Sequence, residues 1–253
     1  MEQVVPALAF KEALFQSRNA EEALLVALNA CASITKRLST IESLDPTSFG
    51  AWFRRIQGQR TGPESVLAAS CLSYLDLRKA NLDITDFYGA DFSHSDLRGI
   101  TAYSANFGVA NLMHANLKSA QLGRANFDSA SMFRANLSQT HLFGSSFRGA
   151  LLEGADFKKA QLDCADLSSA RLTGANLQDA KLVGSNLSAA DLRHAKLAGA
   201  QMQRANLYRT HLEETDLDAA NLDGAVKVDT WGPNVIDRRV GRVIDKSIAA
   251  NQA

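Results

Sequence analysis

The chain is poor in the residues that usually interrupt a regular backbone. Proline occurs four times in 253 residues, and none lies between Pro63 and Pro233. Because proline lacks a backbone N–H, its absence fits a backbone whose amides are needed for pairing with neighbouring segments. The three cysteines, Cys31, Cys71 and Cys164, are scattered. They indicate neither a disulfide framework nor a zinc cluster.

Net charge and long apolar runs are also lacking. The 27 basic residues balance the 27 acidic residues, and no apolar run approaches the roughly 18 residues that suggest a membrane-spanning helix. The segment from Met1 to Pro6 lacks the basic region and apolar stretch that typify a secretory signal. We therefore expect a soluble cytoplasmic protein without a membrane span.

The chain does have an apolar residue at every fifth position from Leu72 to Leu222. These 31 positions hold 22 Leu, 6 Phe, 2 Met and 1 Ala, and the residue two positions earlier is small, mostly Ala. A period of five matches neither the helix period of about 3.6 nor the strand period of about 2, so the chain must turn a corner in every unit. Such self-similarity predicts a solenoid, whose units stack on their neighbours.

The repeated phrase is clearest in Ala175-Asn176-Leu177-Gln178-Asp179 and Ala165-Asp166-Leu167-Ser168-Ser169. It resembles the pentapeptide-repeat family, and the resemblance covers roughly residues 70 to 225. The resemblance implies a β-solenoid, a right-handed quadrilateral β-helix with four units per coil and the central Leu or Phe pointing inward. The 31 units would then form about 7 to 8 coils.

The phenylalanines provide an independent check on the number of units per coil. Phe87, Phe107, Phe127 and Phe147 recur every 20 residues. In a four-sided coil they would stack on one side as an aromatic ladder, which supports a 20-residue coil.

The residue before the central apolar residue carries a second signal. Asp or Asn dominates where the residue number ends in 6, whereas Gln121, His141 and Leu151 show that positions ending in 1 vary freely. Asp and Asn side chains readily accept hydrogen bonds from nearby backbone N–H groups. We therefore expect this side chain to fix the corner on two of the four sides.

The flanks of the repeat differ from it in composition. Residues 1–68 are predicted to be α-helical, and two interpretations remain open: a cap on the end of the rod, or a region that recruits a partner. Residues 69–225 form the predicted solenoid, and residues 226–253 a crossing segment and a helix from Asn234 to about Ala250. An apolar stripe on that helix predicts a homodimer contact, formed by Ile236, Val240, Val243 and Ile248.

No catalytic, metal-binding or cofactor-binding constellation is predicted. His94 and His114 occupy equivalent corner positions one coil apart, with Arg134 next in the column. Two histidines fall short of the usual three or four metal ligands, and the arginine would repel a cation. The pair is therefore interpreted as part of an exposed column.

Apolar residues in outward positions are more informative, because nothing in the fold requires them there. Met113, Phe133 and Leu151 fall on one side in consecutive coils, while Tyr103 and Phe143 bracket Gly123 on the opposite side. A contiguous column can mark a partner site, although irregular corner packing is an equally good interpretation. These five apolar residues form the candidate interaction surface.

The functional hypothesis is a non-enzymatic, bacterial, cytoplasmic scaffold that binds an unidentified protein. One alternative is a protein that protects DNA gyrase or another topoisomerase by imitating DNA, and another is a secreted effector. Residues 71–225 hold 15 basic and 17 acidic residues, and the resulting charge of −2 does not resemble DNA. Nor does it favour binding of nucleic acid.

Overall fold

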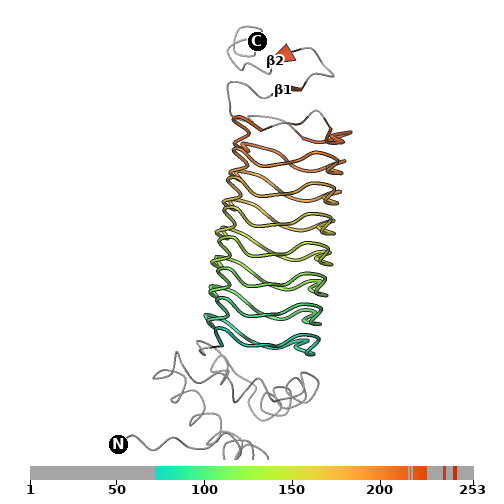
Figure 1. Cartoon of the computed structure of the whole chain (residues 1–253). Helices are drawn as coiled ribbons and strands as arrows, with labels where there is room; N and C mark the ends of the chain where they lie inside the picture. Colours follow the sequence, from blue (N-terminus) through green and yellow to red (C-terminus); the bar gives the residue numbers. More distant parts are fainter. Residues whose placement is uncertain (1–71, 216, 218, 227–235, 238–241, 244–253) are drawn as a thin grey trace, which may run out of the picture.

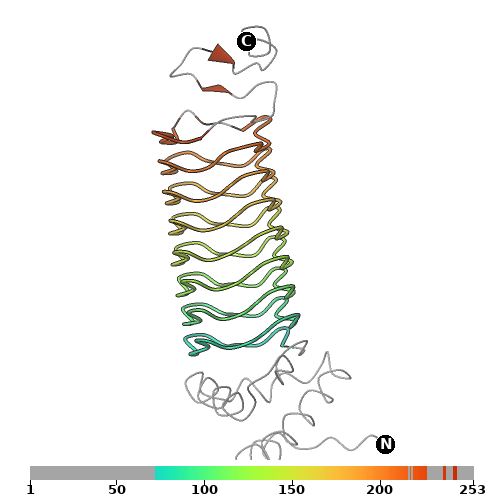
Figure 2. The same cartoon turned by 180° about the vertical axis from the view of Figure 1, so that it is seen from behind.

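The computed structural model describes residues 72–215, 217, 219–226, 236–237 and 242–243. From residue 72 to residue 226 the chain winds into a stack of coils, seen from two sides in Figure 1 and Figure 2. Parallel bridges join residues 20 apart, beginning with Asp76 and Asp96 and ending with Asn206 and Val226. Four five-residue units therefore make one coil, as the phenylalanine spacing predicted.

The solenoid has one continuous core, formed by the inward-pointing side chains of all four sides. All 31 central positions are buried, and none is more than 6% exposed. The small residues two positions earlier share this interior, because a narrow tube has room for only one large side chain per unit. The inward assignment predicted from the sequence is confirmed.

The phenylalanine ladder is present inside one side of the tube. The Phe107 and Phe127 rings stack with centroids 5.0 Å apart, and the Phe127 and Phe147 rings with centroids 4.8 Å apart. Phe92 meets Phe87 edge-on at 5.0 Å from a neighbouring side. The rings therefore stack from coil to coil along this side of the core.

Each corner is a four-residue β-turn whose third residue has a left-handed backbone conformation. At the corner after Leu77, the N–H of Ala80 donates to the carbonyl of Leu77 over 3.0 Å, and Lys79 has a φ of 60°. A positive φ at the third residue alone is the type II arrangement. The same sign recurs at every fifth residue from Tyr74 to Glu214, so the corner conformation is part of the repeat.

The Asp and Asn side chains fix these corners as expected. Asn116 accepts the N–H of Lys118 over 3.2 Å, and Asp156 accepts the N–H of Lys158 over 3.0 Å. Asp91, on one of the freer sides, does the same for Ser93 over 2.9 Å. The sides differ in how often Asp or Asn occurs at this position, because the same hydrogen bond forms wherever either residue is present.

Beyond the solenoid, two short strands pair as an antiparallel hairpin, β1 (Ile236–Asp237) and β2 (Arg242–Val243). The predicted helix from Asn234 to Ala250 is therefore wrong at these four residues. β-Branched residues at positions 236, 240, 243 and 244 suit strands as well as helices, and Gly241 weakens a helix interior. In the register of this hairpin, Ile236 pairs with Val243.

Other expectations lie outside the described residues. These include the helical region predicted for residues 1–68, and the dimer contacts predicted at Val240 and Ile248. In the described part of the chain, no helix has the length and apolarity to cross a bilayer.

Candidate interaction surfaces

The histidine pair belongs to a column of aromatic rings at one corner of the rod. The His94 ring stacks on the Tyr74 ring at 4.8 Å and on the His114 ring at 5.0 Å, with 19° between the two imidazole planes. The edge of the column continues through Phe133, 5.8 Å from His114, and the Arg134 guanidinium lies 5.0 Å from the Phe133 centroid.

This geometry does not favour a metal site. Nearly parallel imidazole planes direct their in-plane nitrogen lone pairs side by side, so these do not converge on one ion. Across the described ranges, no group of three or more His, Cys, Asp or Glu side chains could hold a metal. The histidines contribute ring stacking along the rod.

The candidate surface residues separate into two kinds. Met113, Phe133 and Leu151 are half-buried, whereas Tyr103 is 45% exposed and Phe143 is 55% exposed. Leu151 lies on a flat side of the rod, where it bridges Ser131 and Arg171. Met113 and Phe133 lie at a corner and are partly covered there, whereas Tyr103 and Phe143 expose about half of their surface.

Three further exposed apolar residues lie at the corner of Tyr103 and Phe143 or at the next corner of the coil. Ile84 is 77% exposed, Tyr88 is 52% exposed and Val109 is 50% exposed. By their place in the 20-residue coil, all five residues occupy the two corners that flank the side containing the phenylalanine ladder. We call this set the tyrosine patch: Ile84, Tyr88, Tyr103, Val109 and Phe143.

Both tyrosines of the patch rest on a glycine of the next coil. A Cβ added to Gly108 would lie 3.2 Å from Cδ2 of Tyr88, and one added to Gly123 would lie 3.1 Å from Cδ2 and Cε2 of Tyr103. A larger residue at either position would press against the tyrosine ring, which would have to shift by a few tenths of an ångström. A large corner residue followed 20 residues later by Gly is a sequence signal that could have identified Tyr88.

A ladder of polar side chains runs between the two corners of the patch. The Asn106 side-chain amide donates to Asp86 over 2.9 Å, and that of Asn126 donates to Asn106 over 3.0 Å. These hydrogen bonds link successive coils along the side of the rod that lies between the two corners.

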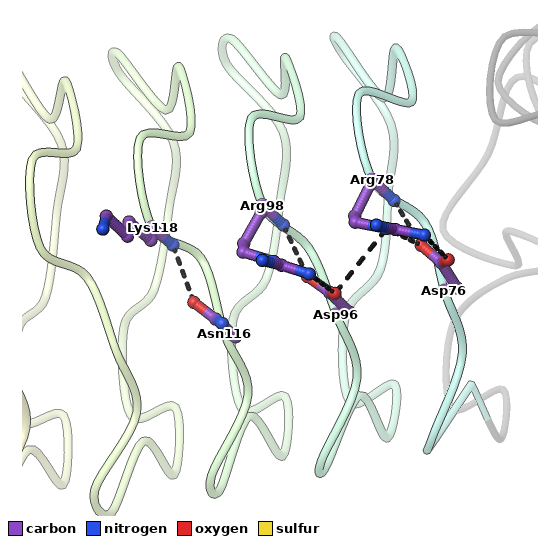
Figure 3. A network of polar contacts seen from close by, with 6 residues as sticks. All are labelled: Asp76, Arg78, Asp96, Arg98, Asn116 and Lys118. Carbon is purple, nitrogen blue, oxygen red and sulfur yellow. Dashed lines mark hydrogen bonds and ion pairs between the residues drawn. The ribbon is translucent and has the colours of Figure 1, made fainter.

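The side that carries Asp76 and Asp96 presents paired charges, as Figure 3 shows. Arg78 donates to Asp76 through Nε over 2.8 Å and Nη2 over 2.5 Å, and Arg98 donates to Asp96 in the same way over 2.7 Å and 2.5 Å. The hydrogen bond from Arg78 lowers the pKa of Asp76. This column therefore offers neither a free basic stripe nor a free acidic stripe.

A shallow hollow of about 310 Å³ lies on another side of the rod, beside Arg171, Asp191, Arg193 and His211. Asp191 accepts hydrogen bonds from Arg193 and Thr173, which hold its pKa at about 2. Arg171 is in turn paired with Glu153 over 2.8 Å. Arg171, Asp191 and Arg193 in the lining of the hollow are therefore already engaged in ion pairs.

Together, the fold and its surfaces define a β-solenoid repeat protein that presents flat sides and regular corners. The family model for pentapeptide repeats matches eight copies, over residues 64–99, 110–149, 150–188 and 185–224. The chain therefore belongs to the pentapeptide-repeat family.

Solved structures of other pentapeptide-repeat proteins are similar to parts of the chain. HetL, involved in heterocyst differentiation regulation in the cyanobacterium Nostoc sp. strain PCC 7120, is 27% identical, with 63% of this chain and 89% of HetL covered and a TM-score of 0.37. A trypsin-treated form of QnrB1, a plasmid-mediated fluoroquinolone resistance protein, is 20% identical, with 71% and 92% covered and a TM-score of 0.47.

A pentapeptide-repeat protein from the thylakoid lumen of Arabidopsis thaliana is 23% identical, with 58% of this chain and 79% of that protein covered and a TM-score of 0.20. With TM-scores below 0.5, these alignments add nothing to the family assignment. The comparison with curated proteins gives no match.

Proposed function

We propose that the chain is a non-enzymatic scaffold that binds a protein partner through the surface of its solenoid. The observation that carries the proposal is the tyrosine patch, which gathers five of the eight large apolar residues that are strongly exposed in the described part of the chain. Exposed apolar side chains gathered on one region of a surface typify protein contacts, and tyrosine is enriched among the residues that dominate binding energy. A bacterial, cytoplasmic setting is part of the proposal.

The rod is suited to this role because its surface is rigid. Backbone bonds tie each corner to the next coil, as in the 2.8 Å bond from the Ile84 N–H to the Tyr103 carbonyl. A surface that is already ordered before binding loses little conformational entropy when a partner docks.

The test is affinity capture with the full chain and with the double variant Tyr103→Ser, Phe143→Ser. Tyr208→Ser is the matched control, because Tyr208 is 38% exposed at an equivalent corner near the other end of the rod. The proposal expects a stoichiometric partner with the parent and the control, and its loss with the double variant.

A chain lacking residues 1–68 separates the two predicted modes of binding. Loss of the partner from this shortened chain, together with retention by the double variant, would place specificity in the N-terminal region. That result would contradict binding through the solenoid surface.

Topoisomerase protection by DNA mimicry is the rival hypothesis, and the charge arrangement favours it less. Imitation of DNA requires a continuous acidic field. Here Asp76, Asp96, Asp128 and Asp191 are each paired with an arginine. A gyrase supercoiling assay with a fluoroquinolone tests the rival: protection at stoichiometric concentration would revive it.

A further inference from the structure

We propose that the tyrosine patch binds one amphipathic helix of a partner protein, laid along the rod, with an apolar stripe and an acidic residue opposite Arg124. The proposal rests on the scaffold function and names the chemistry of the partner. It commits to a single helix for reasons of size, preorganisation and charge.

The size of the patch matches one helix face. The patch extends from the coil of Ile84 to the coil of Phe143, a rise of three coil spacings or about 15 Å at about 4.8 Å each. A helix advances about 5.4 Å per turn, so about three turns span this distance. Apolar residues at positions i, i+3, i+4 and i+7 would meet both corners.

A second copy of the rod fits the patch less well. A stable interface between folded proteins covers about 800 Å² on each partner, whereas the tyrosine patch is confined to one side and four coils. The polar ladder of Asp86, Asn106 and Asn126 occupies the middle of this side, so two such sides would bring amides and carboxylates together. One helix covers less of this polar side than a second rod would, and its own polar residues can meet the ladder between the corners.

The tyrosines are held in place before a partner arrives. Tyr88 lies against Gly108 and Tyr103 against Gly123, and about half of each side chain is still exposed. Rigid aromatic side chains that are positioned beforehand bind at low entropic cost. The role of these two glycines is to accommodate the tyrosine rings, because neither has the positive φ found at the corner position of the repeat.

The charge next to the patch favours an acidic residue in the partner. The Arg124 guanidinium lies 5.8 Å from the Tyr103 centroid, and no ion pair joins it to another described residue. Arg148, by contrast, is paired with Asp128 over 2.5 Å. A carboxylate of the docked helix would therefore meet a cation that is available for pairing.

The carboxylates at the first coil of the patch already accept backbone hydrogen bonds. Asp83 accepts the N–H of Tyr103 over 2.7 Å, and Asp86 accepts the N–H of Tyr88 over 3.1 Å. An acidic residue of the partner would find no hydrogen-bond donor or cation in these two side chains. The partner helix should hence carry its acidic residue towards Arg124, away from the first coil.

The experiment uses two synthetic 18-residue helical peptides as probes, titrated with the full chain by fluorescence anisotropy. Both carry the same stripe of Leu and Trp, and they differ in having Glu or Lys at the one position that would face Arg124. An exposed ion pair contributes up to about 1 kcal/mol, so the Glu peptide should bind about threefold to fivefold more tightly. Arg124→Glu should reverse this preference.

Substitutions in the patch separate docking at this site from binding elsewhere. The double variant Tyr103→Ser, Phe143→Ser should weaken the Glu peptide at least tenfold, while Tyr208→Ser leaves it unchanged. Gly123→Ala should also weaken binding of the Glu peptide, because the new methyl group displaces the Tyr103 ring. This variant deletes no side chain of the patch. Thermal melting of each variant establishes that the fold is retained.

Several outcomes would overturn the inference. They are absence of binding by both peptides, equal affinity of the two peptides with parent and Arg124→Glu, and unchanged affinity of the double variant. A doubling of mass in light scattering that the double variant abolishes would assign the patch to a second copy of the chain. If affinity capture still finds a partner that needs the solenoid, the scaffold function stands although the helix assignment fails.

Discussion

At the scale of single residues, the corners hold side chains in a backbone conformation that most residues avoid. Of the 30 described residues with positive φ, 21 are not glycine. A left-handed residue with a Cβ costs about 1–2 kcal/mol, so this strain recurs along the rod. It is tolerated because each corner is bonded within its own turn and to the neighbouring coil.

This strain predicts that glycine is favoured at the left-handed corner position. Ala189 has a φ of 56° and is exposed, so Ala189→Gly should stabilise the fold by about 0.5–1 kcal/mol after the loss of backbone entropy is subtracted. Ala198→Gly, at an exposed corner position without positive φ, should instead destabilise it by about 0.5–1 kcal/mol. Urea unfolding of both variants tests the contrast, and equal shifts would contradict it.

The ion pair of Asp191 should make the stability of the fold depend on pH in the acid range. The pKa of Asp191 is lowered from 3.8 to about 2, mainly by the hydrogen bond from Arg193. Since the native state holds the carboxylate ionised, its contribution is present above pH 3.8 and is lost as the pH falls through about 2. The melting temperature of the parent should exceed that of Asp191→Asn at pH 6, and the difference should shrink towards pH 2. A difference independent of pH would contradict this account.

At the scale of structural elements, the phenylalanine ladder carries the packing of one side of the tube. Phe127 stacks between Phe107 and Phe147, so Phe127→Ala leaves a void that neighbouring coils cannot close without breaking their bonds. We expect a loss of about 3–5 kcal/mol in the free energy of unfolding. Chemical denaturation measures it, and a loss below about 0.5 kcal/mol would contradict the inward packing.

The small inward residues make the opposite prediction. Ala175 is fully buried beside the central residues of its coil, so Ala175→Leu overfills the tube and should cost about 1–3 kcal/mol. Ala198→Leu, at an exposed corner, adds the same atoms where there is room and should cost little. Similar losses for the two substitutions would show that volume is not the cause.

The sequence predicted the interior elements better than the exterior ones. The resemblance to the pentapeptide-repeat family implied which side chains point inward, and the 20-residue spacing of the phenylalanines placed the ladder from Phe87 to Phe147 on one side. Outward positions obey no such constraint. Ile84, Tyr88 and Val109 were therefore missed, and the strands β1 and β2 were mistaken for part of a helix because Ile and Val at positions 236 and 243 suit either element.

At the scale of the whole molecule, association through residues 226–253 stays a prediction, although its helical basis fails at β1 and β2. The test is light scattering at micromolar concentration on the parent and on the double variant Val240→Asp, Val243→Asp. A symmetric dimer should be disrupted, because a buried unpaired charge is costly. A parent that is monomeric would remove this contact from consideration.

The 20-residue bridges also determine how the molecule responds to a pulling force. Each coil is bonded only to the coil before it and the coil after it, so tension applied at the two ends of the solenoid acts on these bonds in series. Release of one coil frees 20 residues, about 70 Å of extended chain at up to about 3.5 Å per residue. The rod should therefore lengthen in equal steps, each corresponding to the release of one coil.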